Sequence, residues 1–164
     1  MAQLSDLVSR VRLELGDQPS QFTFSTVADG TNTMFDLNSK YIEVSTLYVT
    51  INGVPKAYPT HYSLDAVHGQ ITFLTPPPAG YTVRVEGEGY RYFLDEDICT
   101  FINTAVTQHS HNRSDAYGSQ VTIASIQPVE EYPIAILATI EALWILATDS
   151  SFDINITEIG RAHV

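Results

Sequence analysis

The stretch TLYVTING, residues 46–53, indicates the fold class because it is typical of a β-strand that ends in a tight turn. In an extended chain Leu47, Val49 and Ile51 lie on one face, which we expect to be buried, and the residues between them lie on the other. The closing Asn-Gly pair is the dipeptide that two-residue hairpin turns favour. The stretch therefore predicts part of an antiparallel sheet.

The same pattern continues in both directions from this stretch. Short runs rich in Val, Ile, Thr, Tyr and Phe alternate with turn residues about every eight to twelve positions. The expected strands cover Phe22–Val27, Met34–Leu37, Thr46–Ile51, Tyr58–Leu64, Gln70–Leu74 and Thr82–Gly87. We therefore predict an antiparallel β module over residues 21–89.

Helical periodicity precedes and follows the β module. Apolar residues recur at helical spacing over residues 4–15, and again over residues 94–106 after an acidic start. A third helix is expected from Pro128 to about Thr148, and it is apolar on nearly every side, so it needs more than one neighbour. Residues 1–20 and 90–148 are therefore predicted to form a helical domain that carries the inserted β module, an α+β fold.

The last residues, 149–164, are polar apart from Phe152, Ile154 and Ile156, which stand at alternating positions. This alternation predicts an extended C-terminal arm. Such an arm can add a strand to the sheet edge of a partner. Between the second and third helices, the polar stretch Gln108–Ser119 is expected to be an exposed loop.

Composition excludes several classes of function. Eight basic residues against nineteen acidic ones give a net charge of −11, which disfavours ordinary binding to DNA or RNA. A single cysteine, Cys99, forms no intrachain disulfide, so a reducing cytoplasm suits the chain. The longest apolar run, Ile134–Ala147, contains Glu141 and is shorter than the roughly 20 residues that cross a bilayer, so no membrane contact is expected.

Candidate catalytic and metal-binding groups each have a simpler structural interpretation. His109 and His111 could bind a metal together with Asp115, but side chains two residues apart on a helix do not converge on one point. The acidic run Asp95–Asp97 suits the positive end of a helix dipole. We therefore predict no catalytic, cofactor-binding or metal-binding residue and no enzyme activity.

Glu141 is more informative because it interrupts an apolar helix. A carboxylate in such a position must reach water, a cation or a neighbouring chain. Of these, a contact between subunits is the favoured interpretation.

The order of features resembles one class of phage virion protein. The residues that carry the resemblance are LELGD at 13–17, Phe35, Leu37, the 46–53 stretch, YSLD at 62–65, Gly69, ITF at 71–73, Pro76, Pro77, Gly80, Val83 and Val85. Set between an opening helix and two later helices, they resemble the head-to-tail connector or adaptor proteins of long-tailed phages (siphophages) that infect actinobacteria and their relatives.

The resemblance implies a structural protein of the virion neck, made in the host cytoplasm and placed at the head–tail interface. Such adaptors form a homo-oligomeric ring, expected to be dodecameric, between the portal protein and a stopper or tail-terminator protein. DNA passes through the lumen without specific binding, and no cofactor is implied. Carried onto this sequence, the subunit interface would comprise Ile134, Leu137, Glu141, Leu143 and Trp144, and a portal-binding arm would use Phe152, Ile154 and Ile156.

Two other functions remain open. The first is a carbohydrate- or protein-binding β module of a phage tail or fibre component, with a ligand platform made by Tyr81, Tyr90, Tyr92 and Phe93. The second is an enzyme whose site is assembled from distant residues. Its candidate pairs are His61 with Asp65 and Asp97 with His109.

Overall fold

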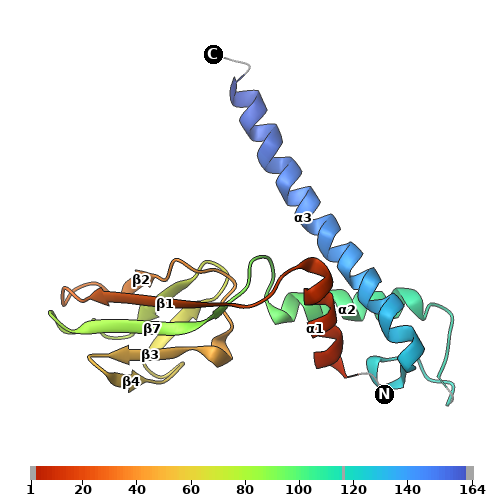
Figure 1. Ribbon diagram of the computed structural model, residues 1–164, viewed down its shortest axis with the longest axis horizontal. Helices are drawn as coiled ribbons and strands as arrows, with labels where there is room; N and C mark the ends of the chain where they lie inside the picture. The colour runs from red at the N-terminus through yellow and green to blue at the C-terminus, as the bar shows by residue number, and fades with distance from the viewer. Residues whose placement is uncertain (1–2, 116, 162–164) are drawn as a thin grey trace. The chain divides into compact units, whose positions relative to one another are not determined.

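The computed structural model describes the backbone of residues 3–115 and 117–161, and the side chains of this part as far as residue 148 (Figure 1). Its contacts divide the chain into a helical unit, Met1–Gly16 with Asp95–Val164, and a β unit, Asp17–Leu94. The described residues form three α-helices and two antiparallel sheets, so the predicted α+β class is confirmed.

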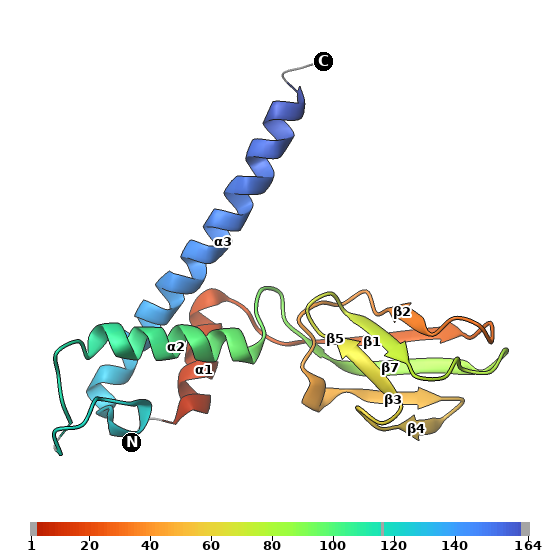
Figure 2. The ribbon, with the colours of Figure 1, turned by 180° about the vertical axis from the view of Figure 1, so that it is seen from behind.

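The β unit consists of two antiparallel sheets. One has the strand order β1-β7-β3-β4 (Figure 2). The other has the strand order β2-β6-β5. The strands are β1 Ser20–Val27, β2 Met34–Asp36, β3 Tyr48–Ile51, β4 Val54–Lys56, β5 Tyr62–Asp65, β6 Gln70–Phe73 and β7 Thr82–Gly89, with a 3₁₀ turn, η1 Val44–Thr46, before β3. The strand β4 was not expected from the sequence, and β5 begins later than predicted.

Both sheets contribute to one hydrophobic core. Its buried members are Ala28, Leu37, Ile42, Val49, Ile51, Tyr62, Ile71, Phe73, Val83 and Val85. The predicted alternation is confirmed for Val49 and Ile51, which are 1% and 9% exposed. Thr50 on the opposite face is also buried, so that face of β3 is not fully solvated.

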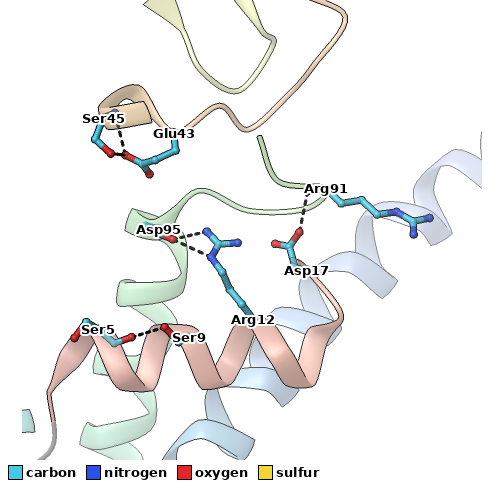
Figure 3. Close-up of polar contacts among 8 residues, drawn as sticks. All are labelled: Ser5, Ser9, Arg12, Asp17, Glu43, Ser45, Arg91 and Asp95. Atoms are coloured by element: carbon cyan, nitrogen blue, oxygen red, sulfur yellow. Dashed lines mark hydrogen bonds and ion pairs between the residues drawn. The ribbon is translucent and has the colours of Figure 1, made fainter. Parts of the chain in front are cut away.

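The chain enters and leaves the β unit side by side. Ser20, the first residue of β1, pairs with Gly89, the last residue of β7. Just outside this pair, a carboxylate oxygen of the buried Asp17 accepts a hydrogen bond from the backbone N–H of Arg91 at 2.8 Å (Figure 3). The two ends of the β unit are therefore fastened to each other.

The helical unit packs three helices against one another. They are α1 Leu4–Leu15, α2 Asp95–His109 and α3 Glu131–Arg161, and two 3₁₀ turns, η2 Ile123–Ser125 and η3 Pro128–Glu130, precede α3. Gly16 ends α1 in the left-handed region (φ 66°), where its N–H bonds the carbonyls of Arg12 and Leu13. The buried residues of this core are Leu7, Val8 and Val11 from α1, Ile98, Phe101, Ile102, Ala105 and Val106 from α2, and Ile134, Ala135, Ala138 and Ala142 from α3.

The C-terminal segment is not the extended arm that the sequence predicted. The helix α3 runs from Glu131 to Arg161, so the backbone at Phe152, Ile154 and Ile156 is helical. Continuing a formed helix adds one hydrogen bond for each residue fixed, and this local gain outweighs an alternating pattern that has no sheet to join. The side chains of these three residues, and all of residues 162–164, lie outside the described part of the structure.

Candidate functional site

The two sides of α3 differ sharply in exposure. One side carries Ala135, Ala138 and Ala142, which are fully buried in the helical unit, where small side chains let helices approach closely. The other side exposes four large apolar residues: Tyr132 at 51%, Ile140 at 57%, Leu143 at 51% and Trp144 at 74%. We call these four residues the apolar strip of α3. An exposed apolar surface of this kind marks a site of association.

Glu141 lies beside the apolar strip and has an unusual environment. Its Oε2 atom is shielded from solvent and has no hydrogen-bond partner among the described residues. A desolvated carboxylate oxygen without a donor is unfavourable by about 1–3 kcal/mol. A hydrogen-bond donor on a neighbouring molecule would remove this cost. Glu141 therefore adds a hydrogen-bond acceptor beside the apolar strip.

The structure separates the residues predicted for the subunit interface. Leu143 and Trp144 belong to the apolar strip, and Leu137 is half-buried near it. Ile134 is fully buried in the core of its own helical unit, so its side chain cannot face a neighbouring subunit and we withdraw it from the predicted set. Sequence reasoning missed Tyr132 and Ile140, although their helical spacing from Leu143 was a usable signal.

The carboxylate of Glu130 fixes the start of α3. It accepts a hydrogen bond from the backbone N–H of Gln127 at 3.1 Å and pairs with Arg113 at 2.6 Å. His109, at the end of α2, lies 3.5 Å away. The bond from Gln127, followed by that from Arg113, holds the pKa of Glu130 below its ordinary value. These contacts tie the end of α2 and the following loop to the base of the strip.

A second ion pair joins the other two helices. Asp95 Oδ1 accepts from Arg12 Nε at 2.9 Å and from Nη2 at 2.5 Å (Figure 3). The Arg12 side chain is 5% exposed and that of Asp95 is 45% exposed. Asp95 therefore does more than favour the helix dipole, because it also holds α1 against the start of α2. Burial raises the pKa of the nearby Cys99 thiol, and Asp95 adds to this effect.

The pairs considered for catalysis are not formed. Asp65 pairs with His68 at 2.8 Å, whereas the ring Nδ1 of His61 lies 3.2 Å from the backbone N of Ala57. Asp97 and His109 both lie on α2, about 18 Å apart along its axis. Among the described residues, no three side chains of metal-ligating type gather in one place.

The β unit has a pocket that the sequence did not predict. It measures about 480 Å³ and is lined mainly by apolar side chains, among them the prolines at 76–78. The polar residues of its lining are Lys56, Thr60, His61, Thr75 and Tyr81. The predicted aromatic platform is not formed as a whole, because Phe93 is buried and the eight residues of β7 separate Tyr81 from Tyr90. Of the four residues, Tyr81, which is 43% exposed, lines this pocket.

One described helix segment, Pro128–Thr148, is long and apolar enough to cross a membrane. This criterion uses length and composition alone, and the core helices of soluble proteins also meet it. The segment includes Glu141, and its alanine side packs in the helical unit.

Comparison with known proteins finds no family model that matches the chain and no similar curated protein. The apolar strip, Glu141 and the β-unit pocket are thus the features from which a function can be argued.

Proposed function

We propose that the chain is a structural protein of the phage virion neck, where copies form a ring that joins the portal to the next head-completion or tail protein. The observation that carries this proposal is the apolar strip of α3, which remains exposed although the opposite side of the helix is packed. The resemblance to phage connector proteins, which covers most of residues 1–148, supplies the virion setting, the dodecameric state and the portal and stopper partners.

The strip has the properties of a subunit interface. Full burial of a large apolar side chain contributes about 1.5–3 kcal/mol, so covering these four partly exposed residues contributes several kcal/mol toward association. Trp144 is the natural anchor, because tryptophan often dominates interface energies. A ring needs a head-to-tail contact in which this strip meets a different surface of the next copy. A donor on that surface would also satisfy Glu141.

The charge of the chain suits a channel that DNA must traverse. A net charge of −11 repels phosphate groups, so DNA would pass a ring of such subunits without adhering. Specific DNA binding is not part of the proposal.

A protein partner fits the strip better than a bilayer does. The helix α1, which packs with α3, has exposed charged residues at Asp6, Arg10 and Glu14. A bilayer around α3 would have to accommodate these charges as well as Glu141, at a cost of several kcal/mol.

The proposal is tested by the mass of the purified chain, alone and mixed with candidate portal rings, measured by light scattering or native mass spectrometry. We expect a ring, or a monomer that joins portals in cyclic stoichiometry. Trp144→Glu should abolish ring formation and attachment to portals, because it puts a charge at the most exposed residue of the strip. Val67→Glu adds the same charge at an exposed turn of the β unit and should assemble like the wild type.

Three results would contradict the proposal. One is a wild-type chain that stays monomeric and does not bind portal rings. Another is a Trp144→Glu variant that forms rings, or joins portals, as the wild type does. The third is binding of the wild type to phosphatidylcholine vesicles that Trp144→Glu abolishes, since this would identify the strip as a membrane anchor.

The pocket in the β unit supports one alternative, a carbohydrate-binding module of a tail or fibre component. Its apolar walls with a few polar groups are typical of small-ligand sites, and Tyr81 offers an aromatic ring at its surface. A glycan array would then give a defined ligand, and Tyr81→Ala should lose that ligand while assembly stays intact. An array without any bound glycan would remove this alternative.

A further inference from the structure

The strand β1 leaves one long edge of its sheet open. It pairs with β7 along its whole length and with no strand on its other side in the described chain. The bond from the Ala28 N–H to the Tyr81 carbonyl, 2.8 Å, shows that even-numbered residues here bond toward β7. Backbone groups alternate in direction along a strand. The N–H and C=O groups of Gln21, Thr23, Ser25 and Val27 therefore point outward.

The other edges of the two sheets carry features that discourage pairing. The strand β4 has three residues with a proline, Pro55, at its centre, and β2 also has only three. The strand β5 has four residues and ends at Asp65. Short length, proline and charge are the usual protection of edge strands. By contrast, β1 has eight residues, SQFTFSTV, without a charge or a proline.

The sequence of β1 is complementary to itself in one antiparallel register. When Phe24 faces Phe24 of a second copy, Thr23 lies opposite Ser25 and Gln21 lies opposite Val27. All four outward residues then bond, which gives about eight backbone hydrogen bonds across the edge. The side chains of Phe22 and Phe24 are only half-buried in the single chain, and this register covers them. An aromatic pair across two strands adds further stability.

Charge favours a second copy as the occupant. The chain carries a net charge of −11, so most surfaces of two copies repel each other. The edge of β1 is uncharged over its whole length and is therefore a place where two copies can meet with little repulsion. We propose that two copies of this chain pair through the outer edge of β1, antiparallel about a two-fold axis at Phe24.

This pairing is independent of the proposed ring, because it uses the β unit and a two-fold contact. We would therefore test it in the full-length Trp144→Glu chain as well as in the wild type, so that contacts of α3 do not contribute. Sedimentation equilibrium over a range of concentrations measures the dimer. Thr23→Pro removes one outward N–H and leaves the bonds to β7 in place, whereas Thr23→Ala keeps that N–H and is the matched control.

We expect the Trp144→Glu chain to form dimers at high concentration, unchanged by Thr23→Ala and at least tenfold weaker with Thr23→Pro, and the wild type to show the same effect of Thr23→Pro. Amide hydrogen exchange gives a second readout that needs no substitution. The amides of Thr23, Ser25 and Val27 should gain protection as concentration rises, whereas those of Phe22 and Phe24, already bonded to β7, should change little.

The proposal is overturned if the Trp144→Glu chain stays monomeric at high concentration. It is equally overturned if Thr23→Pro, shown by circular dichroism to be folded, dimerises like Thr23→Ala. Protection of the outward amides only when another protein is added would assign this edge to a strand of that protein and would also reject the pairing of two copies.

Discussion

Arg12 and Asp95 hold together two helices that are far apart in the sequence, and their different exposure allows a sharp prediction. Asp95→Ala removes one carboxylate that pairs with a nearly buried guanidinium, so we expect a loss of about 1–3 kcal/mol in the free energy of unfolding. Arg12→Met should cost less, because methionine fills a similar volume and the half-exposed Asp95 can be hydrated. Urea unfolding followed by circular dichroism measures both. An equal or larger loss for Arg12→Met would show that the guanidinium makes the more important contribution.

Glu130 is the residue for which pH dependence is expected. Its pKa in the folded chain lies below the ordinary value of 4.5, because the Gln127 N–H and Arg113 favour the ionised form. The resulting stabilisation is fully present above the unfolded pKa and is lost as the pH falls through the lowered folded value. Glu130→Gln should therefore cost roughly 1–2 kcal/mol at neutral pH, and its difference from the wild type should shrink in acid.

Unfolding curves at several pH values between about 3 and 7 test this prediction. Glu131→Gln removes the same charge from a residue that makes no ion pair in the described part of the chain, so it should remain close to the wild type. A constant difference between Glu130→Gln and the wild type at all pH values would contradict the argument.

The turn between β5 and β6 packs directly on another loop. A Cβ atom at Gly69 would lie 1.6 Å from the carbonyl oxygen of Ser39, and Gly69 has a φ of +72°. Gly53, in the turn between β3 and β4, has a similar φ of +78° but no atom within 4 Å of such a Cβ. Gly53→Ala should cost only the backbone strain, about 1–2 kcal/mol. Gly69→Ala should cost about 3 kcal/mol or more, because backbone must move.

Thermal unfolding of the two alanine variants measures this difference. Similar losses would mean that the Ser39 loop moves away at little cost and does not fix the turn.

Local patterns predicted these elements unequally. The strand at residues 48–51, the Asn52-Gly53 turn and the Gly16 stop have local causes, and each is present in the structure. The strand begins two residues later than predicted, and the expected alternation of burial fails at Thr50, because packing by the rest of the β unit buries that residue as well. The short strand β4 was missed because Pro55 disfavours a strand. In the structure β4 nevertheless pairs with β3, as an edge strand. The predicted end of α3 was wrong. Alternating apolar residues at Phe152, Ile154 and Ile156 do not stop a helix that has already formed in the preceding residues. The exposure of Trp144 and the burial of Ile134 depend on packing with α1 and α2, which no local pattern contains.

For the whole molecule, the two proposed contacts differ in symmetry. A ring built through α3 uses head-to-tail contacts, whereas pairing through β1 is two-fold. If both contacts form in one assembly, the β1 contacts join two rings face to face. If the two contacts form at different times, the β1 dimer is a storage form that must separate before a ring forms. The masses of the wild-type, Trp144→Glu and Thr23→Pro chains distinguish these cases.

The first and last residues of the β unit lie next to each other, and this bears on how such a chain could have evolved. Because Ser20 pairs with Gly89 and Asp17 binds Arg91, the unit starts and finishes at neighbouring points of its own surface. A segment of this kind can enter a gene in a single event and interrupt the host polypeptide by little more than the spacing of two strands, about 5 Å. The helical unit and the β unit can then have separate evolutionary origins. Related genes could encode a different inserted domain, or none, between Gly16 and Asp95.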